Sequence, residues 1–237
     1  MEGPLNSDQA YQASQAYLAN LEVLVAARTE QLRTVMREME RCYDITLLAL
    51  GDALRLKDAE IASHSQRVTA FSIAICRALG GPKDQIDVIA RGASLHDIGM
   101  LGVPEAILRK PGALSAEETT SMREHCNAGY QLLRKIPFLA DTAEVVFAHH
   151  ERYDGTGYPR GLKGDRIPLE ARICAVAETF DAITSDRPYR AARSLEAAQA
   201  EIKAGSGKQF DPTVVRVFLG IHAQVWDALR SEIRSRS

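Results

Sequence analysis

Apolar residues in the N-terminal part of the chain recur at alternating steps of three and four. They occupy positions Leu18, Leu21, Val25, Leu32, Val35, Met39, Cys42, Ala49, Ala53 and Leu56. This is the spacing of a coiled coil, in which one apolar side of a helix packs against a partner helix. Arg28 and Thr46 interrupt the series, and such polar interruptions fix register and oligomeric state at some cost in stability. The pattern predicts a long N-terminal helix.

Two packing arrangements fit this helix. The favoured one is a parallel homodimer, because more than three heptads without proline exceed what an ordinary packed helix shows. The alternative is a single amphipathic helix that lies on its own domain. We expect residues 1–56 to form a coiled-coil signalling helix and residues 57–237 to form one globular domain.

The remaining sequence predicts further helices that glycine and proline separate. Ser115-Ala-Glu-Glu118 is a capping box, Gly80-Gly81-Pro82 stops a helix, and Asp211-Pro212 caps a final helix that holds Trp226. The predicted helices run from about 58 to 79, from 83 to 98 with Gly99 and Gly102 breaking it, from 115 to 135, from Pro137 to His149, from Ile167-Pro168 through Asp181, and from 211 onward. No strand pattern and no glycine-rich nucleotide fingerprint occurs, so the predicted fold is all-α.

Composition and charge narrow the functional classes. The chain has 237 residues, of which 46% are hydrophobic and 25% charged, as in an ordinary globular protein. The net charge of −2 gives no general reason to expect binding to nucleic acid or to an anionic membrane. The N-terminus lacks a signal-peptide pattern and no segment reaches ~20 apolar residues, so we expect a cytoplasmic protein without membrane insertion. The four cysteines are far apart, which favours buried side chains over disulfides.

Histidines and acids carry the candidate chemistry. Of six histidines, His64, His96, His125, His149 and His150 have acids in suggestive places, and His222 does not. The segment from His149 to Pro159 reads His-His-Glu-Arg-Tyr-Asp-Gly-Thr-Gly-Tyr-Pro, which places metal-ligand side chains beside a loop shaped by glycine and proline. Alone, a His-His pair is more often a surface feature and Asp-Gly-Thr-Gly is first of all a turn. The combination points to a metal site.

These motifs together resemble the HD-GYP domain, a branch of the HD superfamily of metal-dependent phosphohydrolases. The resemblance runs from about Asp44 to about Asp211. It includes His64-Ser-Gln-Arg-Val68, the His96-Asp97 doublet, His125, the segment from His149 to Pro159, Ile167-Pro168 and Glu178-Thr-Phe-Asp181-Ala. It implies an HD-superfamily helical bundle with extra C-terminal helices. It also implies hydrolysis of cyclic di-GMP to pGpG, with GMP as a further product.

The resemblance implies a set of metal ligands. They are Glu60, His64, His96, Asp97, His125, His149, His150 and Asp181, with His96 and Asp97 as the catalytic doublet. Glu60 and His64 are four residues apart and share one face of a helix, although this spacing also suits a surface pair. Members that carry such a Glu resemble three-metal sites, and members without it resemble two-metal sites. A mixed histidine and carboxylate set suits iron or manganese and leaves zinc open.

Substrate contacts are expected from two segments. In the loop, the candidates are Arg152, Asp154, Gly155, Thr156, Gly157 and Tyr158, the last four shaping a wall for guanine or ribose. Further along, Arg187, Arg190 and Arg193 can fork onto phosphate oxygens. A solvated face or a carboxylate partner explains these three arginines equally well.

One position departs from the family pattern. The family sequence continues His-Asp-Ile-Gly-Lys, whereas this chain has Met100 in place of the lysine. A cation expected near the scissile phosphate is thereby lost. Two other functions stay open: a catalytically weakened module that binds cyclic di-GMP and signals through its coiled coil, and a module that contacts other signalling proteins. Cyclic GMP-AMP is an alternative substrate.

Overall fold

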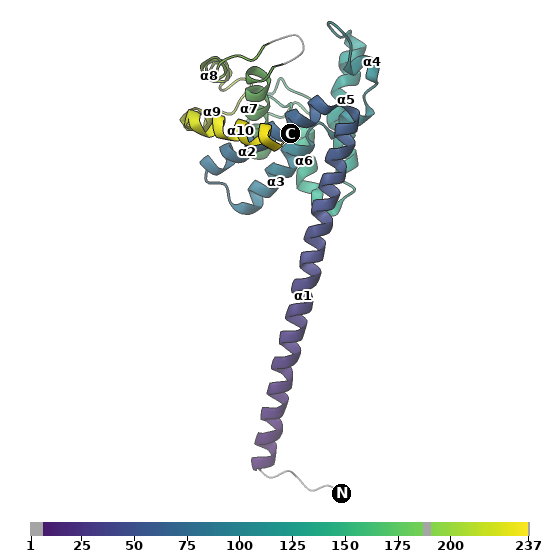
Figure 1. The fold of residues 1–237 in the computed structure, drawn as a ribbon, viewed down its shortest axis with the longest axis vertical. Coiled ribbons are helices and arrows are strands. Elements are labelled where there is room, and N and C mark those ends of the chain that lie inside the picture. Colours follow the sequence, from purple (N-terminus) through teal and green to yellow (C-terminus); the bar gives the residue numbers. More distant parts are fainter. Residues whose placement is uncertain (1–6, 187–190, 237) are drawn as a thin grey trace. The chain divides into compact units, whose positions relative to one another are not determined.

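The computed structural model describes residues 7–186 and 191–236, and their architecture is helical (Figure 1). Within these ranges the only bridge is an isolated one between Ser206 and Phe210. The α-helices are α1 (Ser7–Lys57), α2 (Ala59–Ala78), α3 (Lys83–Leu95), α4 (Glu105–Leu108), α5 (Ala116–Leu133), α6 (Ala140–Ala148), α7 (Leu169–Thr184), α8 (Leu195–Ala204), α9 (Pro212–Gly220) and α10 (Ala223–Arg236), and the 3-10 helices are η1 (Ile98–Gly102), η2 (Pro137–Leu139) and η3 (Gly164–Arg166). No helix among the described residues is long and apolar enough to cross a membrane. The predicted all-α fold is confirmed.

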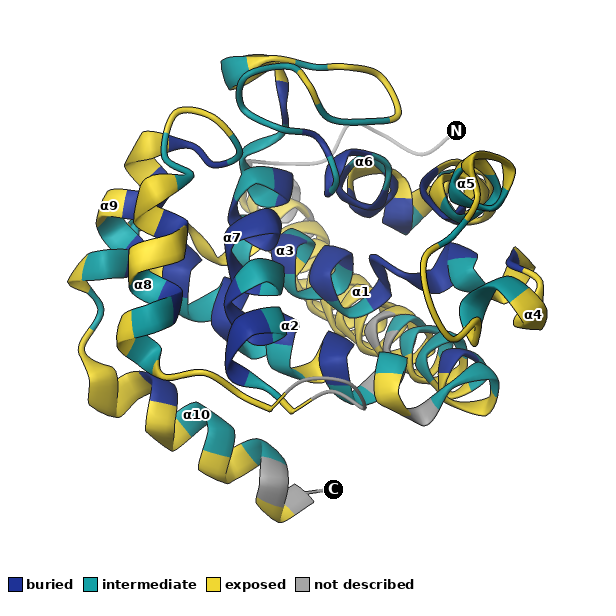
Figure 2. Ribbon diagram, turned by 90° about the horizontal axis from the view of Figure 1, so that it is seen from above, coloured by how far each residue is buried: buried dark blue, intermediate teal, exposed yellow. Residues whose placement is uncertain are grey.

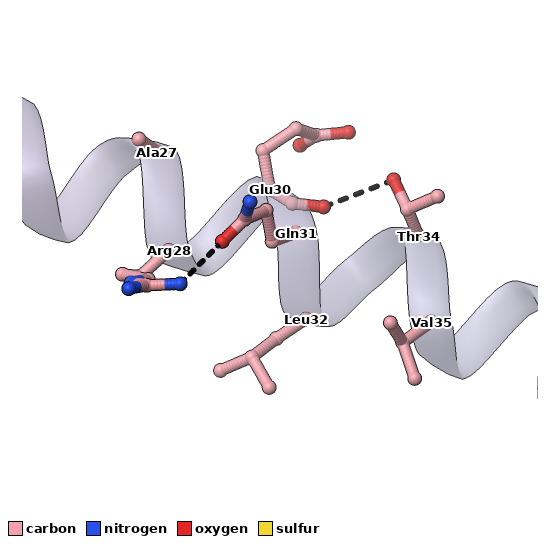
Figure 3. Close-up of a pocket in the computed structure, with 7 residues that line it drawn as sticks. All are labelled: Ala27, Arg28, Glu30, Gln31, Leu32, Thr34 and Val35. Carbon is pink, nitrogen blue, oxygen red and sulfur yellow. Dashed lines mark hydrogen bonds between the residues drawn. The ribbon is translucent and has the colours of Figure 1, made fainter.

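The chain divides into two compact units between Leu48 and Ala49. The N-terminal unit consists of the greater part of α1. Its apolar positions are exposed, with 65% of Leu32 and 51% of Val35 accessible to solvent. Figure 3 shows these two side chains on one side of α1, with Glu30 pointing from another. The unit therefore presents the apolar stripe that a coiled coil requires, and its pairing stays a prediction.

A capped break separates α1 from α2. The Asp58 side chain accepts hydrogen bonds from the backbone N–H groups of Glu60 at 2.8 Å and Ile61 at 3.4 Å. Asp58 has an extended conformation and ends the long helix, as an N-cap residue does. Leu54 is buried, and Lys57 Nζ donates to the backbone oxygen of Val103 at 3.0 Å. The second helix therefore begins where the sequence predicted.

The core of the second unit is built around α2, α3 and α7, whose inner faces are buried (Figure 2). Helices α8, α9 and α10 contribute further buried residues to the same core. Four aromatic side chains meet there. Phe180 has ring-centroid distances of 4.9 Å to Phe71, 5.2 Å to Phe218 and 4.9 Å to Trp226. This core fixes α2, α3 and α7, which carry His64, lead into His96 and carry Asp181.

The predicted final helix is two helices. Asp211 caps α9 as expected, because its side chain accepts from Thr213 N–H at 2.6 Å. However, α9 ends at Gly220, Ile221 is extended, and Trp226 lies on the separate helix α10. The turn allows α10 to change direction, so that Trp226 enters the aromatic core. The single C-terminal helix in the sequence prediction was wrong.

The helix before the His-Asp doublet is also shorter than predicted. It ends at Leu95 instead of Ile98, and the chain continues into η1. Gly99 does not break the helix. A Cβ atom at Gly99 would lie 1.9 Å from the backbone oxygen of His125, so this glycine permits η1 to pack directly on α5. The close packing holds the doublet against the helix that carries His125.

Candidate metal centre

Three histidines have one ring nitrogen fixed by the backbone. In His96, His125 and His149, Nδ1 lies 2.7–2.8 Å from the carbonyl oxygen three residues earlier, which belongs to Ala93, Met122 and Val146 respectively. A carbonyl oxygen only accepts hydrogen bonds, so each Nδ1 must be the donor. In a neutral imidazole the other nitrogen, Nε2, then carries a lone pair. Each ring is therefore oriented as metal-binding histidines are.

The free nitrogens of these rings converge. His125 Nε2 lies 3.2 Å from His149 Nε2, and both are acceptors in the neutral rings. His96 Nε2 is buried and has no hydrogen-bond partner among the described residues. Unpartnered buried acceptors are costly, and two facing lone pairs repel. A cation between them removes both problems, so the donor set fits a metal ion.

Asp97 lies between these nitrogens, just beyond the end of α3. Its Oδ2 atom is 3.3 Å from His96 Nε2, and its Oδ1 atom is 3.7 Å from His125 Nε2. The two oxygens thus face two different histidines, which is the arrangement of a bridging carboxylate. Burial would raise the pKa of Asp97, but the neighbouring His96 holds it well below its usual value. The carboxylate is therefore ionised and available as a ligand.

The electrostatics favour positive charge at this point. Burial would lower the pKa of His96, but the negative charge of the adjacent Asp97 carboxylate raises that pKa to about 9. Without a metal, a proton takes the place of the cation. Burial, followed by the charges of the neighbouring histidines, lowers the pKa of His149 well below its usual value. His149 is thus neutral, the form that binds a metal.

The donor atoms form two groups that Asp97 connects. One contains His64, His96 and Asp97, and the other contains His125, Cys126, His149 and His150, and within each group the ligand atoms lie within 4.8 Å of one another. Burial raises the pKa of the Cys126 thiol, so it stays protonated. Cys126 is buried, as a small apolar residue would be. Six of the eight predicted metal ligands therefore meet in two adjacent groups.

Asp181 joins the first group through His64. Its Oδ2 atom lies 2.6 Å from His64 Nδ1. Arg67 holds the same carboxylate with Nε at 2.6 Å and Nη2 at 3.1 Å, and Ser185 Oγ donates to it at 2.9 Å. Burial would raise the pKa of Asp181, but these hydrogen bonds lower it to about 2. Arg67 was missed as a site residue, although its place one turn after His64 in the quoted motif is a usable signal.

Glu60 lies apart from both donor groups. Its side chain is 60% exposed, and its nearest recorded charged partner is Arg67 Nη2 at 3.5 Å. The partner of Glu60 is therefore Arg67, seven residues along α2, and not His64 as in the i,i+4 surface pair, because His64 is buried against Asp181. The third-metal role of Glu60 stays a prediction.

The loop after His150 is held by its own polar groups. The Asp154 carboxylate accepts from the backbone N–H of Thr156 at 2.9 Å and from its hydroxyl at 2.6 Å, and Arg152 Nε donates to that hydroxyl at 3.0 Å. Gly155 has a φ of +87°, whereas Gly157 is required for space, since a Cβ there would lie 2.3 Å from Arg152 N. These residues shape the loop, and their proposed contacts with substrate stay a prediction.

Glu151 fixes the far side of this loop and was not among the predicted site residues. It is 4% exposed, and its two carboxylate oxygens accept from the N–H groups of Arg160 at 2.7 Å and Leu162 at 3.0 Å. In the sequence, Tyr158 lies between Glu151 and Arg160, and its ring centroid is 4.9 Å from that of His150. The signal for Glu151 was its place directly after the histidine pair.

The three predicted phosphate-binding arginines differ in outcome. Arg187 and Arg190 lie outside the described residues. Arg193 Nη1 contacts Glu201 Oε2 at 2.7 Å on the surface, which matches the carboxylate-partner alternative.

Met100 is half-buried in η1, and its backbone N–H donates to the backbone oxygen of Asp97 at 2.8 Å. The residue at the position of the family lysine therefore lies in the turn that directly follows the His96-Asp97 doublet.

Helices α2, α3, α5 and α6 thus deliver histidines to one buried point, with a His-Asp doublet in the middle. An all-helical bundle with this arrangement defines a class of metal-binding domains with histidine and carboxylate ligands. The sequence matches the family described as an HD domain over residues 49–214. The chain belongs to the HD domain family, and its motifs place it in the HD-GYP branch.

Comparison with individual proteins agrees with this assignment. The chain is 42% identical over 219 residues to the cyclic di-GMP phosphodiesterase of Thermotoga maritima, covering 92% of this chain and 60% of that protein. It is 34% identical over 180 residues to the 3'3'-cGAMP-specific phosphodiesterase 2 of Vibrio cholerae, covering 75% and 34% respectively. The crystal structure of a V. cholerae cyclic GMP-AMP specific phosphodiesterase, V-cGAP3, has the same fold, with a TM-score of 0.61, 22% identity, and coverage of 81% of this chain and 52% of that one. The chain therefore spans less than two thirds of the relatives it matches.

Proposed function

We propose that the domain is a metal-dependent phosphodiesterase that hydrolyses cyclic di-GMP to pGpG, with GMP as the product of a second cleavage. The observation that carries the proposal is the approach of His96 Nε2 and His125 Nε2 to the two oxygens of the Asp97 carboxylate, with His149 Nε2 at 3.2 Å from His125 Nε2. Hydrolysis of a phosphodiester needs a bound water and positive charge at the phosphate oxygens, and this donor set suits the cations that provide both. The named activity of the T. maritima relative supports the choice of substrate.

Six residues would bind the two metal ions, and two others would orient one of these ligands. His64, His96 and Asp97 would bind one ion, and His125, His149 and His150 the second, with Asp97 between them. Divalent metals bound there supply Lewis acidity and lower the pKa of a coordinated water. Asp181 and Arg67 orient His64, and the buried position of the doublet keeps bulk water from the ionised carboxylate.

We further propose iron or manganese as the metal. Nitrogen and carboxylate ligands in a mixed set suit these ions, whereas a site built for structural zinc is usually closed by cysteine thiolates. Because the Cys126 thiol is protonated, it does not act as a thiolate ligand, which agrees with a mixed nitrogen and carboxylate set. Two ions account for the two donor groups, and a third would require Glu60 to turn inward from the surface.

Product analysis tests the proposal. Purified protein loaded with Mn²⁺, or with Fe²⁺ under anaerobic conditions, is incubated with cyclic di-GMP and, separately, with 3'3'-cGAMP, and the products are separated by chromatography. We expect pGpG from cyclic di-GMP and no cleavage after removal of metal by a chelator. Absence of both cleavage and binding with every metal would refute the proposal.

A second candidate function follows from Met100. A methionine supplies no charge to the phosphate, so the domain would bind cyclic di-GMP with slow hydrolysis and transmit a signal through α1. The named specificity of the V. cholerae 3'3'-cGAMP-specific phosphodiesterase 2 supports cyclic GMP-AMP as the alternative substrate. A cytoplasmic location and contacts with other signalling proteins stay predictions.

We also propose that α1 forms a parallel homodimer. Its apolar positions, including Leu32 and Val35, are exposed in the single chain and follow the heptad spacing. Glutamate at both positions should convert the dimer to a monomer, because two charges buried in each helix of a coiled coil cost several kcal/mol. Analytical ultracentrifugation measures the change. Val23, exposed on the outer side of the heptad, gives the matched control: Val23→Glu should leave the dimer intact.

Orientation is tested through Cys42, an exposed cysteine at an apolar heptad position. A parallel pair in register places the two Cys42 side chains opposite each other. Mild oxidation should therefore yield a disulfide-linked dimer that Cys42→Ser abolishes. A dimer that resists cross-linking would contradict the parallel arrangement, and a monomeric unmutated protein would contradict dimerisation itself.

A further inference from the structure

Arg123 lies at the outer end of a row of side chains that begins at the metal centre. The His150 and Tyr158 rings are 4.9 Å apart, and the Arg123 guanidinium carbon lies 4.6 Å from the Tyr158 ring centroid. Arg123 is exposed on α5, two residues before His125. Arg123 on α5 and Tyr158 in the loop after His150 thus lie side by side, and the Tyr158 ring separates the Arg123 cation from the candidate ligand His150.

The Arg123 guanidinium differs from several other arginines of the domain. Carboxylates hold Arg67 through Asp181, Arg160 through Glu144, Arg172 through Asp165 and Asp211, and Arg193 through Glu201. In the part of the chain that the structure describes, the recorded contact of Arg123 is with the Tyr158 ring, and no salt bridge is recorded. A cation held over an aromatic ring keeps its N–H donors for another acceptor. Arg123 is therefore oriented and still able to bind an anion.

We propose that Arg123 binds the phosphodiester of the cyclic dinucleotide that is not being cleaved. This inference rests on the proposed function. A cyclic dinucleotide carries two phosphodiesters, and the candidate metal ligands account for only one of them. The second anion needs a cation displaced from the metals, and Arg123 is displaced by the Tyr158 ring. Its planar fork matches two phosphate oxygens.

The role predicts a particular kinetic change. A contact with the remote phosphate is equally strong in the ground state and the transition state, so its loss raises KM and leaves kcat unchanged. Arg123→Gln should raise KM for cyclic di-GMP by about 10- to 100-fold, the usual effect of losing a hydrogen bond to a charged group. Hydrolysis of bis(4-nitrophenyl) phosphate, which has a single phosphodiester, should be unaffected.

Arg134 provides the matched control. It also lies over an aromatic ring, with its guanidinium carbon 5.6 Å from the Tyr130 centroid, and it caps the opposite end of α5 from the ligand His125. Arg134→Gln should change KM for neither substrate. Metal content is measured in every variant, and both substitutions should leave it at the unmutated level.

Arg123→Lys separates phosphate binding from stacking on a base. Lysine keeps the charge but loses the planar fork, so its affinity should lie between those of the unmutated protein and the glutamine variant. A lysine variant as weak as the glutamine variant would overturn the phosphate assignment, as would an unchanged KM in Arg123→Gln while the unmutated protein cleaves cyclic di-GMP. If the protein binds without cleaving, the dissociation constant replaces KM. If it neither binds nor cleaves, the proposed function falls together with this inference.

Discussion

Asp97→Ala should remove the metals and the hydrolytic activity together. The Asp97 oxygens face His96 Nε2 at 3.3 Å and His125 Nε2 at 3.7 Å, so its loss takes a ligand from both donor groups. Loss of residues that merely support a metal ligand already costs about 10- to 100-fold in affinity, and loss of a shared ligand should cost more. The metal-to-protein ratio by elemental analysis and the cleavage rate of cyclic di-GMP are the two measurements.

His222→Ala is the control for this substitution. His222 is exposed and lies outside the donor groups. Its removal should change neither metal content nor rate. Full metal occupancy in the Asp97 variant would show that the carboxylate does not bridge the two groups, whatever happens to the activity.

Met100→Lys should raise the rate of cleavage more than the affinity. Met100 follows the doublet in η1, its N–H donates to the backbone oxygen of Asp97, and the HD-GYP pattern carries a lysine at this position. Removing one donor aimed at the developing charge typically costs ~10²–10³ in rate, and restoring one should recover part of that factor. Single-turnover cleavage and equilibrium binding, both in metal-loaded protein, separate the two effects.

The neighbouring Leu101 supplies the control. It lies in the same short helix and is 39% exposed, so Leu101→Lys adds an equal charge at a solvent-facing position. It should leave the cleavage rate unchanged. Fast turnover in the unmutated protein that lysine at position 100 fails to improve would mean that the site is organised around the methionine. In that case the alternative of a catalytically weakened module that binds cyclic di-GMP would lose its main support.

The helices were predictable because they rest on local rules. Asp58, Ser115 and Asp211 each cap a helix through their own side chain, and these short-range hydrogen bonds are visible as sequence spacing. The resemblance to the HD-GYP domain then indicated which histidines share a site. The structure brings six of the predicted ligands into two groups and places Asp181 against His64.

The features that the sequence did not reveal depend on contacts between distant segments. Arg67 binds a carboxylate 114 positions away, and Glu151 holds a loop through backbone N–H groups that have no side-chain signature. Gly99 looked like a helix breaker, but its role is to let η1 approach α5. Local propensity cannot distinguish a glycine that ends a helix from one that makes room for a neighbour. The same limit explains why the turn between α9 and α10 was missed.

Trp226 has a consequence for where the folding unit ends. The match to the HD domain family stops at residue 214, yet the tryptophan that completes the aromatic core lies twelve residues beyond it. A chain shortened to the matched region would lose Phe218 together with Trp226, and would leave Phe71 and Phe180 exposed where those two rings had covered them. The evolutionary boundary and the thermodynamic boundary are therefore different, and α10 belongs to the minimal stable domain. Variation in the C-terminal segment among relatives would then be tolerated only where it keeps a large apolar side chain over Phe180.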